Sequence, residues 1–388
     1  MAHTLISFLG RVPKGAAGYR TTRYSFDGTP GEPTAFIGWS LRRRLLPDQL
    51  VILGTAGSMW DHLFETDIDL GAAAEDERLA LQEATEARAV SAALLAPLAP
   101  LLAQRLGCGV RLALIPYCRN ESEQLDLLAI MAAQVEQGDR VSLDVTHGFR
   151  HLPMLALLSV MHLRVVRAAQ IQGIYYGAYD PDTGAAPVID LSGLMRIADW
   201  LKALNTYDKD GDYGAFAELL GPAGGQLARA AYFERTSNPV KAREALTTWF
   251  SRSDRHPDHD PTAHLFRSQL EARVRWFRLP DRPAWEKHLA WEYLDLRDYV
   301  RAAIYGLEAV ISGEVIQRGL DAGNFDCRNT LREELRHQRE GFRTLVHLRN
   351  ALAHGVRPFN QEIERALSDE SNLRNALNSL FTQLLGNP

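Results

Sequence analysis

Along the first 200 residues, short apolar runs alternate with loops of small or polar residues and with longer helical stretches. The pattern predicts helices that include 75–98 and 152–169, and strands at 4–10, 49–54, 110–117, 140–146 and 171–179. Strands that alternate with helices indicate βαβ units, in which helices cover both faces of a mainly parallel sheet. We therefore expect an α/β fold in this half, with ligands bound beyond the carboxyl ends of the strands.

From about residue 194 the pattern becomes helical only, because apolar residues recur at spacings of three and four. The predicted helical segments are 194–207, 212–221, 240–252, 263–278, 285–320 and 331–355, and a polar loop is expected at 251–264. We therefore divide the chain into an α/β domain at 1–193 and an all-α bundle at 194–388.

Composition limits the class of protein. Hydrophobic residues make up 46% and charged residues 23% of the 388 positions, which is the balance of a soluble globular chain. The longest apolar runs fall short of a membrane span, and no signal peptide is visible, so we expect a cytoplasmic protein. Three scattered cysteines do not form a disulfide framework or a zinc site. A net charge of −5 argues against a polyanion-binding surface over the whole chain.

The strand predicted at 140–146 has an unusual polar face. Ser142, Asp144 and Thr146 alternate with apolar residues, although parallel strands are usually apolar on both faces. His147 and Gly148 follow at the carboxyl end, just before a helix whose first N–H groups can bind an anion. Thr146, His147 and Arg150 offer further donors to phosphate oxygens.

Two other strand ends carry similar residues, in "LGRVPKGAAGYRTTRY" after the first strand and in "GTAGSMW" after the second. Glycines, hydroxyls and cations at three strand ends predict a pocket for a phosphate-bearing ligand of nucleotide size. The candidate ligand-binding residues are Gly10, Arg11, Lys14, Thr55, Gly57, Ser58, Asp144, Thr146, His147, Gly148 and Arg150. The alternative is that Asp144 only caps a neighbouring turn and that the loops are ordinary connections. No strict G-x-G-x-x-G or P-loop motif is present, which disfavours a dinucleotide or ATPase site.

A second group of polar residues lies in "FRTLVHLRNALAHG", 342–355. On a helix, Leu345, Leu348 and Leu352 form a core stripe, while His347, Asn350 and His354 project almost opposite. Residues 328–357 hold seven arginines against three glutamates, so this segment is locally basic.

This composition suits phosphate chemistry. An imidazole can deprotonate a ribose 2′-OH or protonate a leaving oxygen, and arginine can stabilise charge on the phosphoryl group. Since no pair of carboxylates accompanies these residues, we expect RNA cleavage without a metal. The alternative is that His354 and Gly355 simply end the helix.

Two motifs carry a resemblance to known families. Arg349–Asn350–Ala351–Leu352–Ala353–His354 matches the R-x-x-x-x-H motif of HEPN ribonucleases, including the polar residue after the arginine. Asp144–Val145–Thr146–His147–Gly148 matches the D-x-T-H-G motif of CRISPR-associated proteins whose N-terminal CARF domains are Rossmann-like. With the motifs in this order, the chain resembles a CARF–HEPN ribonuclease of type III CRISPR systems.

The resemblance implies an endoribonuclease that acts on single-stranded RNA and is activated by a cyclic oligoadenylate bound across a CARF dimer. Its catalytic residues would be Arg349 and His354, with Asn350 in support. It implies no cofactor and no metal, and we favour a ring of four adenylates over six as the activator. The rival interpretation is a CARF-type sensor that binds cyclic oligoadenylate, recruits a partner or represses transcription, and cuts nothing. Activity on the cyclic nucleotide itself could coexist with either function.

Helix geometry adds a prediction about assembly. Arg349 and His354 differ by about 140° around one helix, so a single copy does not easily direct both at one phosphate. Two copies about a two-fold axis can do so, which predicts a homodimer. Elsewhere, His62 is expected at a polar helix position.

Overall fold

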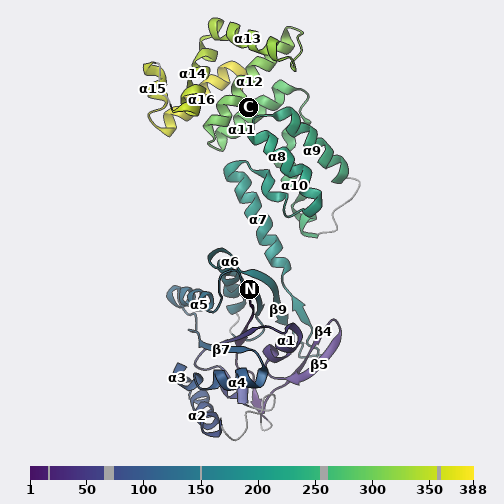
Figure 1. Ribbon diagram of the computed structural model, residues 1–388, viewed down its shortest axis with the longest axis vertical. Coiled ribbons are helices and arrows are strands. Elements are labelled where there is room, and N and C mark those ends of the chain that lie inside the picture. The colour runs from purple at the N-terminus through teal and green to yellow at the C-terminus, as the bar shows by residue number, and fades with distance from the viewer. Residues whose placement is uncertain (16–17, 65–73, 149–150, 254–260, 356–359) are drawn as a thin grey trace. The chain divides into compact units, whose positions relative to one another are not determined.

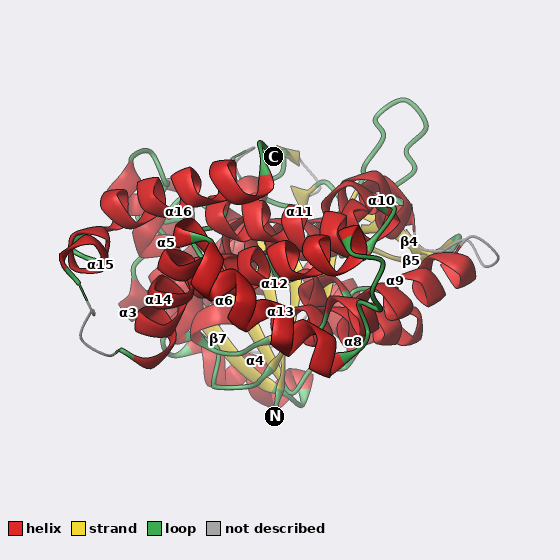
Figure 2. Cartoon of the chain, turned by 90° about the horizontal axis from the view of Figure 1, so that it is seen from above, coloured by secondary structure: helices red, strands yellow, loops and turns green. Residues whose placement is uncertain are grey.

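The computed structural model describes residues 1–15, 18–64, 74–148, 151–253, 261–355 and 360–388. The chain forms two compact units, Met1–Met195 and Arg196–Pro388 (Figure 1). All described strands, yellow in Figure 2, lie before residue 191. The predicted class, α/β followed by all-α, is thus confirmed.

A six-stranded sheet forms the centre of the N-terminal unit, with strand order β10-β9-β8-β1-β6-β7. Its strands are β1 (His3–Leu9), β6 (Gln49–Gly54), β7 (Gly109–Leu114), β8 (Arg140–Asp144), β9 (Gln170–Gly177) and β10 (Val188–Asp190). All neighbours pair in parallel except β10, which runs antiparallel to β9. The five predicted strands are therefore confirmed, with ends shifted by a few residues.

Helices cover both faces of this sheet because successive strand residues point to opposite sides. Leu5 and Leu9 of β1 belong to one core cluster, and Ile6 and Phe8 belong to the other. The first cluster includes residues of α1 (Ile37–Leu45), α2 (Glu75–Glu86), α3 (Ala92–Leu95) and α4 (Leu98–Leu106). The second includes residues of α5 (Glu121–Ala133) and α6 (Leu152–Val166). The sheet therefore has two cores.

Two predictions for this unit are wrong in detail. The single helix expected at 75–98 is instead α2 and α3, separated at Arg88, which adopts a left-handed φ of 56°; α4 then begins at its last position, with Pro97 as N-cap. The loop after β1 contains short strands that alternation did not reveal: β2 (Lys14–Gly15), β3 (Gly18–Tyr19), β4 (Thr22–Phe26) and β5 (Thr29–Thr34). They pair as two antiparallel ribbons, β2–β3 and β4–β5.

The C-terminal unit is helical throughout its described residues. Its α-helices are α7 (Gly193–Asp210, which begins just before the unit boundary), α8 (Gly225–Arg235), α9 (Pro239–Ser253), α10 (Pro261–Arg273), α11 (Arg282–Asp295), α12 (Tyr299–Gln317), α13 (Phe325–Gln338), α14 (Glu340–His354), α15 (Gln361–Ala366) and α16 (Glu370–Leu385). Short 3₁₀ helices lie at Tyr213–Phe216, Gly221–Gly224 and Arg275–Arg278. None of the described helices is both long and apolar enough to cross a bilayer.

Capping residues explain where several of these helices begin and why two predicted segments are interrupted. The segment expected at 285–320 breaks at Arg297, which has a φ of 61°, and Asp298 then caps α12 by accepting from the Arg301 N–H at 2.9 Å. The segment expected at 331–355 breaks at Arg339, which is extended at the junction of α13 and α14. Half of the polar loop expected at 251–264 lies outside the described residues, and the described positions on either side of it belong to α9 and α10, so the expected loop was too long.

Candidate functional site

A cavity of about 340 Å³ opens beyond the carboxyl ends of β1, β6, β7 and β8 in the N-terminal unit. The chain runs from β1 outward through β6 and β7, then returns to the other side of β1 as β8. Such a reversal of strand order leaves a crevice between diverging loops, where α/β sheets bind ligands. Six predicted residues line the cavity: Gly10, Arg11, Thr55, Gly57, Ser58 and Gly148.

Glycines allow these loops to approach one another closely. A Cβ on Gly10 would lie 2.6 Å from the backbone nitrogen of Gly148, so the loop after β1 approaches the loop after β8 this closely only because residue 10 is glycine. Gly148 also has a φ of 115°, and its Cβ would lie 2.6 Å from a methyl of Leu152. These glycines shape the wall of the cavity.

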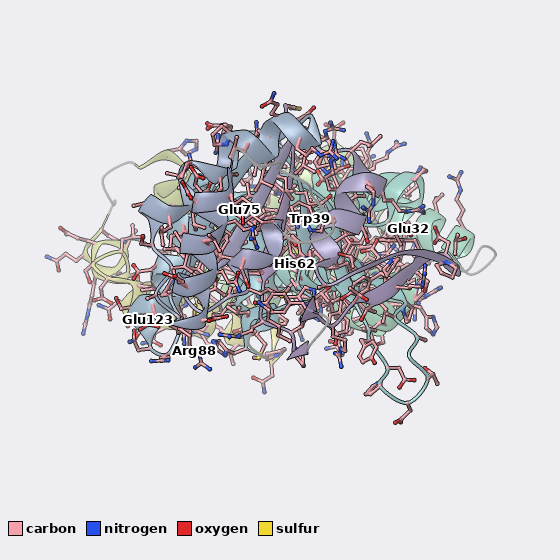
Figure 3. All side chains as sticks on the ribbon, turned by 90° about the horizontal axis from the view of Figure 1, so that it is seen from below. Glu32, Trp39, His62, Glu75, Arg88 and Glu123 are labelled. Carbon is pink, nitrogen blue, oxygen red and sulfur yellow. The ribbon has the colours of Figure 1, made fainter. Side chains whose placement is uncertain are left out.

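The polar groups of the cavity come from two directions. Thr55 and Ser58 are buried, and the Thr55 N–H donates to Ser58 Oγ at 2.9 Å, which fixes the tight turn after β6. Arg11 and Arg88 are exposed, and their side chains form no hydrogen bond or ion pair with any described residue (Arg88 is labelled in Figure 3). The cavity thus combines hydroxyls at its base with two uncompensated cations.

Arg88 and Tyr117 were missed by the sequence analysis. Arg88 follows α2 in the left-handed conformation, which nothing in the local sequence indicates. Tyr117 lies just beyond β7, and its ring packs against the Arg119 guanidinium at 4.6 Å. Since Tyr117 falls at a predicted strand end, the rule that located the other residues could have found it.

Three side chains of the D-x-T-H-G motif do not line the cavity. Asp144 is fully buried and accepts from the Ser7 hydroxyl and from the Thr146 N–H, the latter at 2.9 Å. Burial raises the pKa of Asp144 to about 6. The Thr146 hydroxyl accepts from the Gly177 N–H at 2.8 Å. These bonds tie the end of β8 to β1 and β9, which explains the polar face of the strand.

His147 also packs inside the protein. Its Nε2 lies 3.5 Å from the Tyr24 hydroxyl, and its ring lies 6.1 Å from that of Phe36. Part of its surface remains accessible, but desolvation by the surrounding atoms lowers its pKa to about 4. His147 is therefore neutral near pH 7.

Two further predicted residues lie apart from the cavity or cannot be placed. Lys14 forms an ion pair with Asp61 at 2.9 Å, and Arg150 lies outside the described residues. His62 is buried in the 3₁₀ helix Trp60–Phe64, 5.8 Å from the ring of Tyr19 (Figure 3), so the expected polar helix position is wrong.

The second candidate site lies on α14 in the helical unit. Leu345 and Leu348 are buried and Leu352 is half-buried, which confirms the predicted core stripe. Arg349 and Asn350 are half-buried, and His354 is exposed in the last turn, before Gly355 ends the helix with a φ of 60°. None of these three polar side chains forms a hydrogen bond or ion pair with a described residue.

The charge of Arg349 is not neutralised by its surroundings. Burial and the nearby Arg332 lower the pKa of Arg349, and Glu308 opposes them. The Glu308 carboxylate already accepts from Arg328. Because guanidinium remains protonated under all ordinary conditions, Arg349 presents an uncompensated positive charge beside a free amide. Such a group can bind a phosphate.

The family match lies within the N-terminal unit. Residues 4–181 match the family described as CRISPR system endoribonuclease Csx1, CARF domain. The chain is 27% identical over 223 residues to the CRISPR-associated protein MJ1674 of Methanocaldococcus jannaschii. That alignment covers 52% of this chain and 35% of the relative, so the chain spans about a third of the relative's length.

Among solved structures, the chain is similar to Enterococcus italicus Csm6 bound to cyclic hexa-2'-fluoro-hexa-dAMP. The match covers 99% of this chain and 94% of that one, with 12% identity and a TM-score of 0.34. A similarity this low adds nothing to the assignment of either unit.

Proposed function

We propose that this protein is a metal-independent endoribonuclease of type III CRISPR defence, activated by cyclic oligoadenylate that its N-terminal unit binds; the match of residues 4–181 to the CARF domain of the Csx1 family supports this. One combination of features carries the proposal: a strand-end cavity lined by free cations lies in one unit, and an unneutralised arginine and an exposed histidine lie on one helix of the other.

In the N-terminal unit, the activator's phosphates contact Arg11 and Arg88, and its ribose or phosphate oxygens form hydrogen bonds with the Thr55 and Ser58 hydroxyls. Charge-assisted hydrogen bonds to phosphate are the stronger kind, and two free guanidiniums can supply them. Gly10 and Gly148 let the backbone come close to the ligand. We favour a ring of four adenylates over six.

In the helical unit, cleavage uses the RNA's own 2′-OH as nucleophile. His354 moves the proton, since an imidazole can take or give one near neutral pH. Arg349 stabilises the charge that develops on the phosphoryl oxygens, and Asn350 orients the phosphate. The O2′–P bond forms as the P–O5′ bond breaks, which leaves a 2′,3′-cyclic phosphate and a 5′-hydroxyl. The R-x-x-x-x-H motif at 349–354 supports a HEPN ribonuclease as the type of this unit.

The protein acts as a homodimer, and α6 offers a surface for the contact. Met154, Leu158, Met161 and Val165 are 73%, 54%, 40% and 80% exposed, at spacings of four, three and four residues. This spacing places them on one face, as in helices that pack against a copy of themselves. The helix starts at Leu152, which lines the cavity, so a two-fold axis along α6 would bring two cavities together around one cyclic ligand.

A mixed dimer tests the shared active site. Wild type is combined with the Arg349→Ala/His354→Ala chain, and the tagged heterodimer is purified. A composite site predicts activity well below half of wild type per dimer. A value near half would mean that each chain cuts independently.

The proposed function is tested by cleavage of a fluorescent single-stranded RNA with cyclic tetra-adenylate, cyclic hexa-adenylate or no activator, each with and without EDTA. We expect activator-dependent cleavage that resists EDTA, with products that end in 2′,3′-cyclic phosphate. A substrate with 2′-deoxyribose at the scissile position should resist. Cleavage of DNA, or loss of activity in EDTA, would refute the mechanism.

A further inference from the structure

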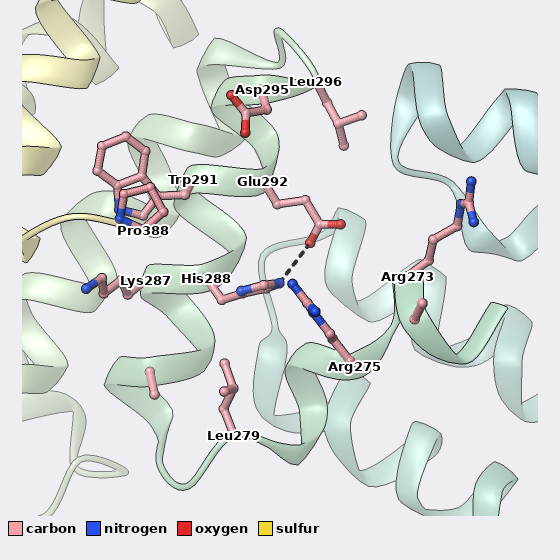
Figure 4. Close-up of a pocket in the computed structure, with 12 residues that line it drawn as sticks. Arg273, Arg275, Leu279, Lys287, His288, Trp291, Glu292, Asp295, Leu296 and Pro388 are labelled. Atoms are coloured by element: carbon pink, nitrogen blue, oxygen red, sulfur yellow. Dashed lines mark ion pairs between the residues drawn. The ribbon is translucent and has the colours of Figure 1, made fainter. Parts of the chain in front are cut away.

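The cations of the helical unit differ in whether they come together. A cavity of about 740 Å³ lies between α11 and the end of α10, and Arg275 and Lys287 line it without a hydrogen bond or ion pair to any described residue. Figure 4 places these two cations on opposite sides of His288, with Arg275 beside Glu292. They therefore do not form a site for one anion, and the helices α13 and α14 offer a different arrangement.

The arginines of α13 and α14 differ in whether a carboxylate neutralises them. Arg332, Arg343 and Arg349 form no hydrogen bond or ion pair with any described residue. Arg343 is exposed to water, whereas Arg332 and Arg349 are half-buried. The other arginines of this segment have partners: Arg328 donates to Glu308, Arg336 lies 3.7 Å from Glu333, and Arg339 lies 2.6 Å from Glu314. Two half-buried guanidiniums therefore lack a counter-ion among the described residues.

The carboxylates that follow Arg332 in the sequence are engaged by other arginines. Glu333 lies beside Arg336, and Glu334 accepts from Arg318 at 2.7 Å. Arg332 thus keeps its full charge in a half-buried position. Because partial burial of an unpaired charge costs free energy, such a position is typical of a site that an anion enters.

Arg332 lies near Arg349. One turn before Arg332 on α13, the guanidinium of Arg328 donates to Glu308 of α12. Burial lowers the pKa of Arg349, the nearby Arg332 lowers it further, and Glu308 opposes both, so each of these two residues lies close to Arg349. Arg332, Arg349 and the Arg328–Glu308 pair therefore form one cluster where α12, α13 and α14 pack together.

A hydrogen-bond network fixes the neutralised part of this cluster. Besides Glu308, Arg328 donates to the Ser312 hydroxyl at 2.9 Å. That hydroxyl donates in turn to the buried Glu286, which also accepts from Arg282 at 2.6 Å. Since Arg328 and Glu308 are held by these bonds, the two arginines without a partner are the ones that remain available to a ligand.

A phosphate group fits between these two arginines. Like charges held close together repel each other unless an anion lies between them. A phosphate can accept from two guanidiniums at once, through its two nonbridging oxygens. In the cleavage step described above, negative charge grows on these same oxygens as the O2′–P bond forms, so each cation would stabilise one of them.

We propose that Arg332 is a second cationic residue of the RNA-cleavage site, and that its guanidinium contacts one nonbridging oxygen of the scissile phosphate while Arg349 contacts the other. This inference rests on the proposed function of α14. It adds a residue from the preceding helix, which the motif at 349–354 does not contain.

The test compares steady-state cleavage of a single-stranded RNA, at saturating activator, by wild type and by Arg332→Ala. The kcat should fall about tenfold to a hundredfold, because a hydrogen bond to a charged oxygen is lost and this bond strengthens in the transition state. Arg336→Ala is the matched control, since it lies one turn further along α13, and it should stay within about twofold of wild type. Arg332→Lys keeps the charge but not the planar fork, so its kcat should lie between those of Arg332→Ala and wild type.

Thermal unfolding separates this role from a structural one. Arg332→Ala breaks no hydrogen bond to a described residue, and it removes the repulsion of Arg349. Its melting temperature should therefore equal or exceed that of wild type. A lower melting temperature together with lost activity would assign Arg332 to the fold and overturn the inference.

Sulfur substitution in the RNA locates the contact. Each nonbridging oxygen of the scissile phosphate is replaced by sulfur in turn, which weakens a hydrogen bond at that position. Sulfur at the oxygen that Arg332 contacts should slow wild type but have little further effect on Arg332→Ala. Unchanged kcat in Arg332→Ala, a change in KM alone, or equal sulfur effects in both proteins would overturn the inference and leave the proposed function intact. A wild type that cuts no RNA with activator would refute the proposed function itself, and the inference with it.

Discussion

The two motifs that first suggested a function are used by the structure in opposite ways. The side chains of Asp144, Thr146 and His147 lie inside the protein. Those of Asp144 and Thr146 accept hydrogen bonds from the neighbouring strands β1 and β9. Arg349 and His354 carry no bond to any described residue. Polar residues at a strand end can thus build the frame of a pocket, whereas Arg349 and His354 on α14 remain available for chemistry.

The comparison changes how a motif should be interpreted. Among the described residues that line the cavity of the N-terminal unit, the unbonded cations are Arg11 and Arg88, of which only Arg11 lies near a recognisable sequence pattern. The D-x-T-H-G side chains hold the end of β8, and only Gly148 of the motif lines the cavity. In the helical unit the motif residues themselves are the accessible groups. Substitutions should therefore affect stability in one motif and activity in the other.

The largest effect is expected at α14. Arg349→Ala and His354→Ala should each reduce RNA cleavage by about 10³-fold, because one removes charge stabilisation and the other removes proton transfer. The melting temperature should stay near that of wild type, since neither side chain is bonded. Rates of activated cleavage and thermal unfolding check both statements.

Arg336→Ala serves as the control for α14. This exposed arginine lies on α13, where its nearest carboxylate is that of Glu333 at 3.7 Å. Its cleavage rate should remain within about twofold of wild type. If it fell as far as that of Arg349→Ala, general charge rather than a specific arginine would explain activity.

The next largest effect concerns the strand-end cavity of the N-terminal unit. Arg11→Ala and Arg88→Ala should each weaken binding of cyclic tetra-adenylate about tenfold to a hundredfold, since a hydrogen bond to a charged group contributes about 1.5–3 kcal/mol. Calorimetry measures the loss. Arg23→Ala is the control, because it also removes a cation from the N-terminal unit but Arg23 does not line the cavity. It should bind like wild type. Unchanged binding in both cavity variants would exclude this cavity as the activator site.

Asp144→Asn should act on stability instead. The amide cannot accept from both Ser7 and Thr146 as the carboxylate does, so a buried donor loses its acceptor. Unfolding free energy should fall by about 1–3 kcal/mol. Calorimetry at a temperature where the variant is folded should show activator affinity within a few-fold of wild type. Lost affinity in a stable protein would mean that Asp144 contacts the ligand.

The smallest effect is a pH dependence from His147. Its pKa in the folded protein, about 4, lies below the ordinary 6.5, so between these pH values the folded state binds fewer protons than the unfolded state. The stability that neutral His147 provides is therefore full above pH 6.5 and is lost as pH falls toward 4. Wild type should lose about 1–3 kcal/mol over this range relative to His147→Gln. Parallel melting profiles for the two proteins would show that His147 does not titrate in this way.

The strands could be predicted from the sequence because apolar runs in a parallel sheet are long and bounded by polar loops. Since carboxyl ends of such strands meet at one edge, Gly10 and Thr55 could be placed together as well. The ribbon β2–β3 could not, because two-residue strands rich in glycine show no alternation. The break at Arg88 was hidden for another reason: only the packed structure selects a left-handed conformation at a residue other than glycine.

The burial of the D-x-T-H-G side chains could also not be predicted from the sequence. Alternation placed Asp144 and Thr146 on one face of a strand, but it could not say that Ser7 and Gly177 on adjacent strands would satisfy them. On α14 the apolar and polar faces could be predicted from the sequence, since helical spacing alone separates the leucine stripe from the polar side.

Gating of RNA cleavage by the CARF cavity is the central claim, and one titration tests it most directly. The initial rate of single-stranded RNA cleavage is measured against cyclic tetra-adenylate concentration for wild type and for Arg11→Ala/Arg88→Ala. We predict no cleavage without activator, and a half-maximal concentration that rises at least about tenfold in the variant while the maximal rate is retained. Identical curves for the two proteins, or full cleavage without activator, would contradict the claim.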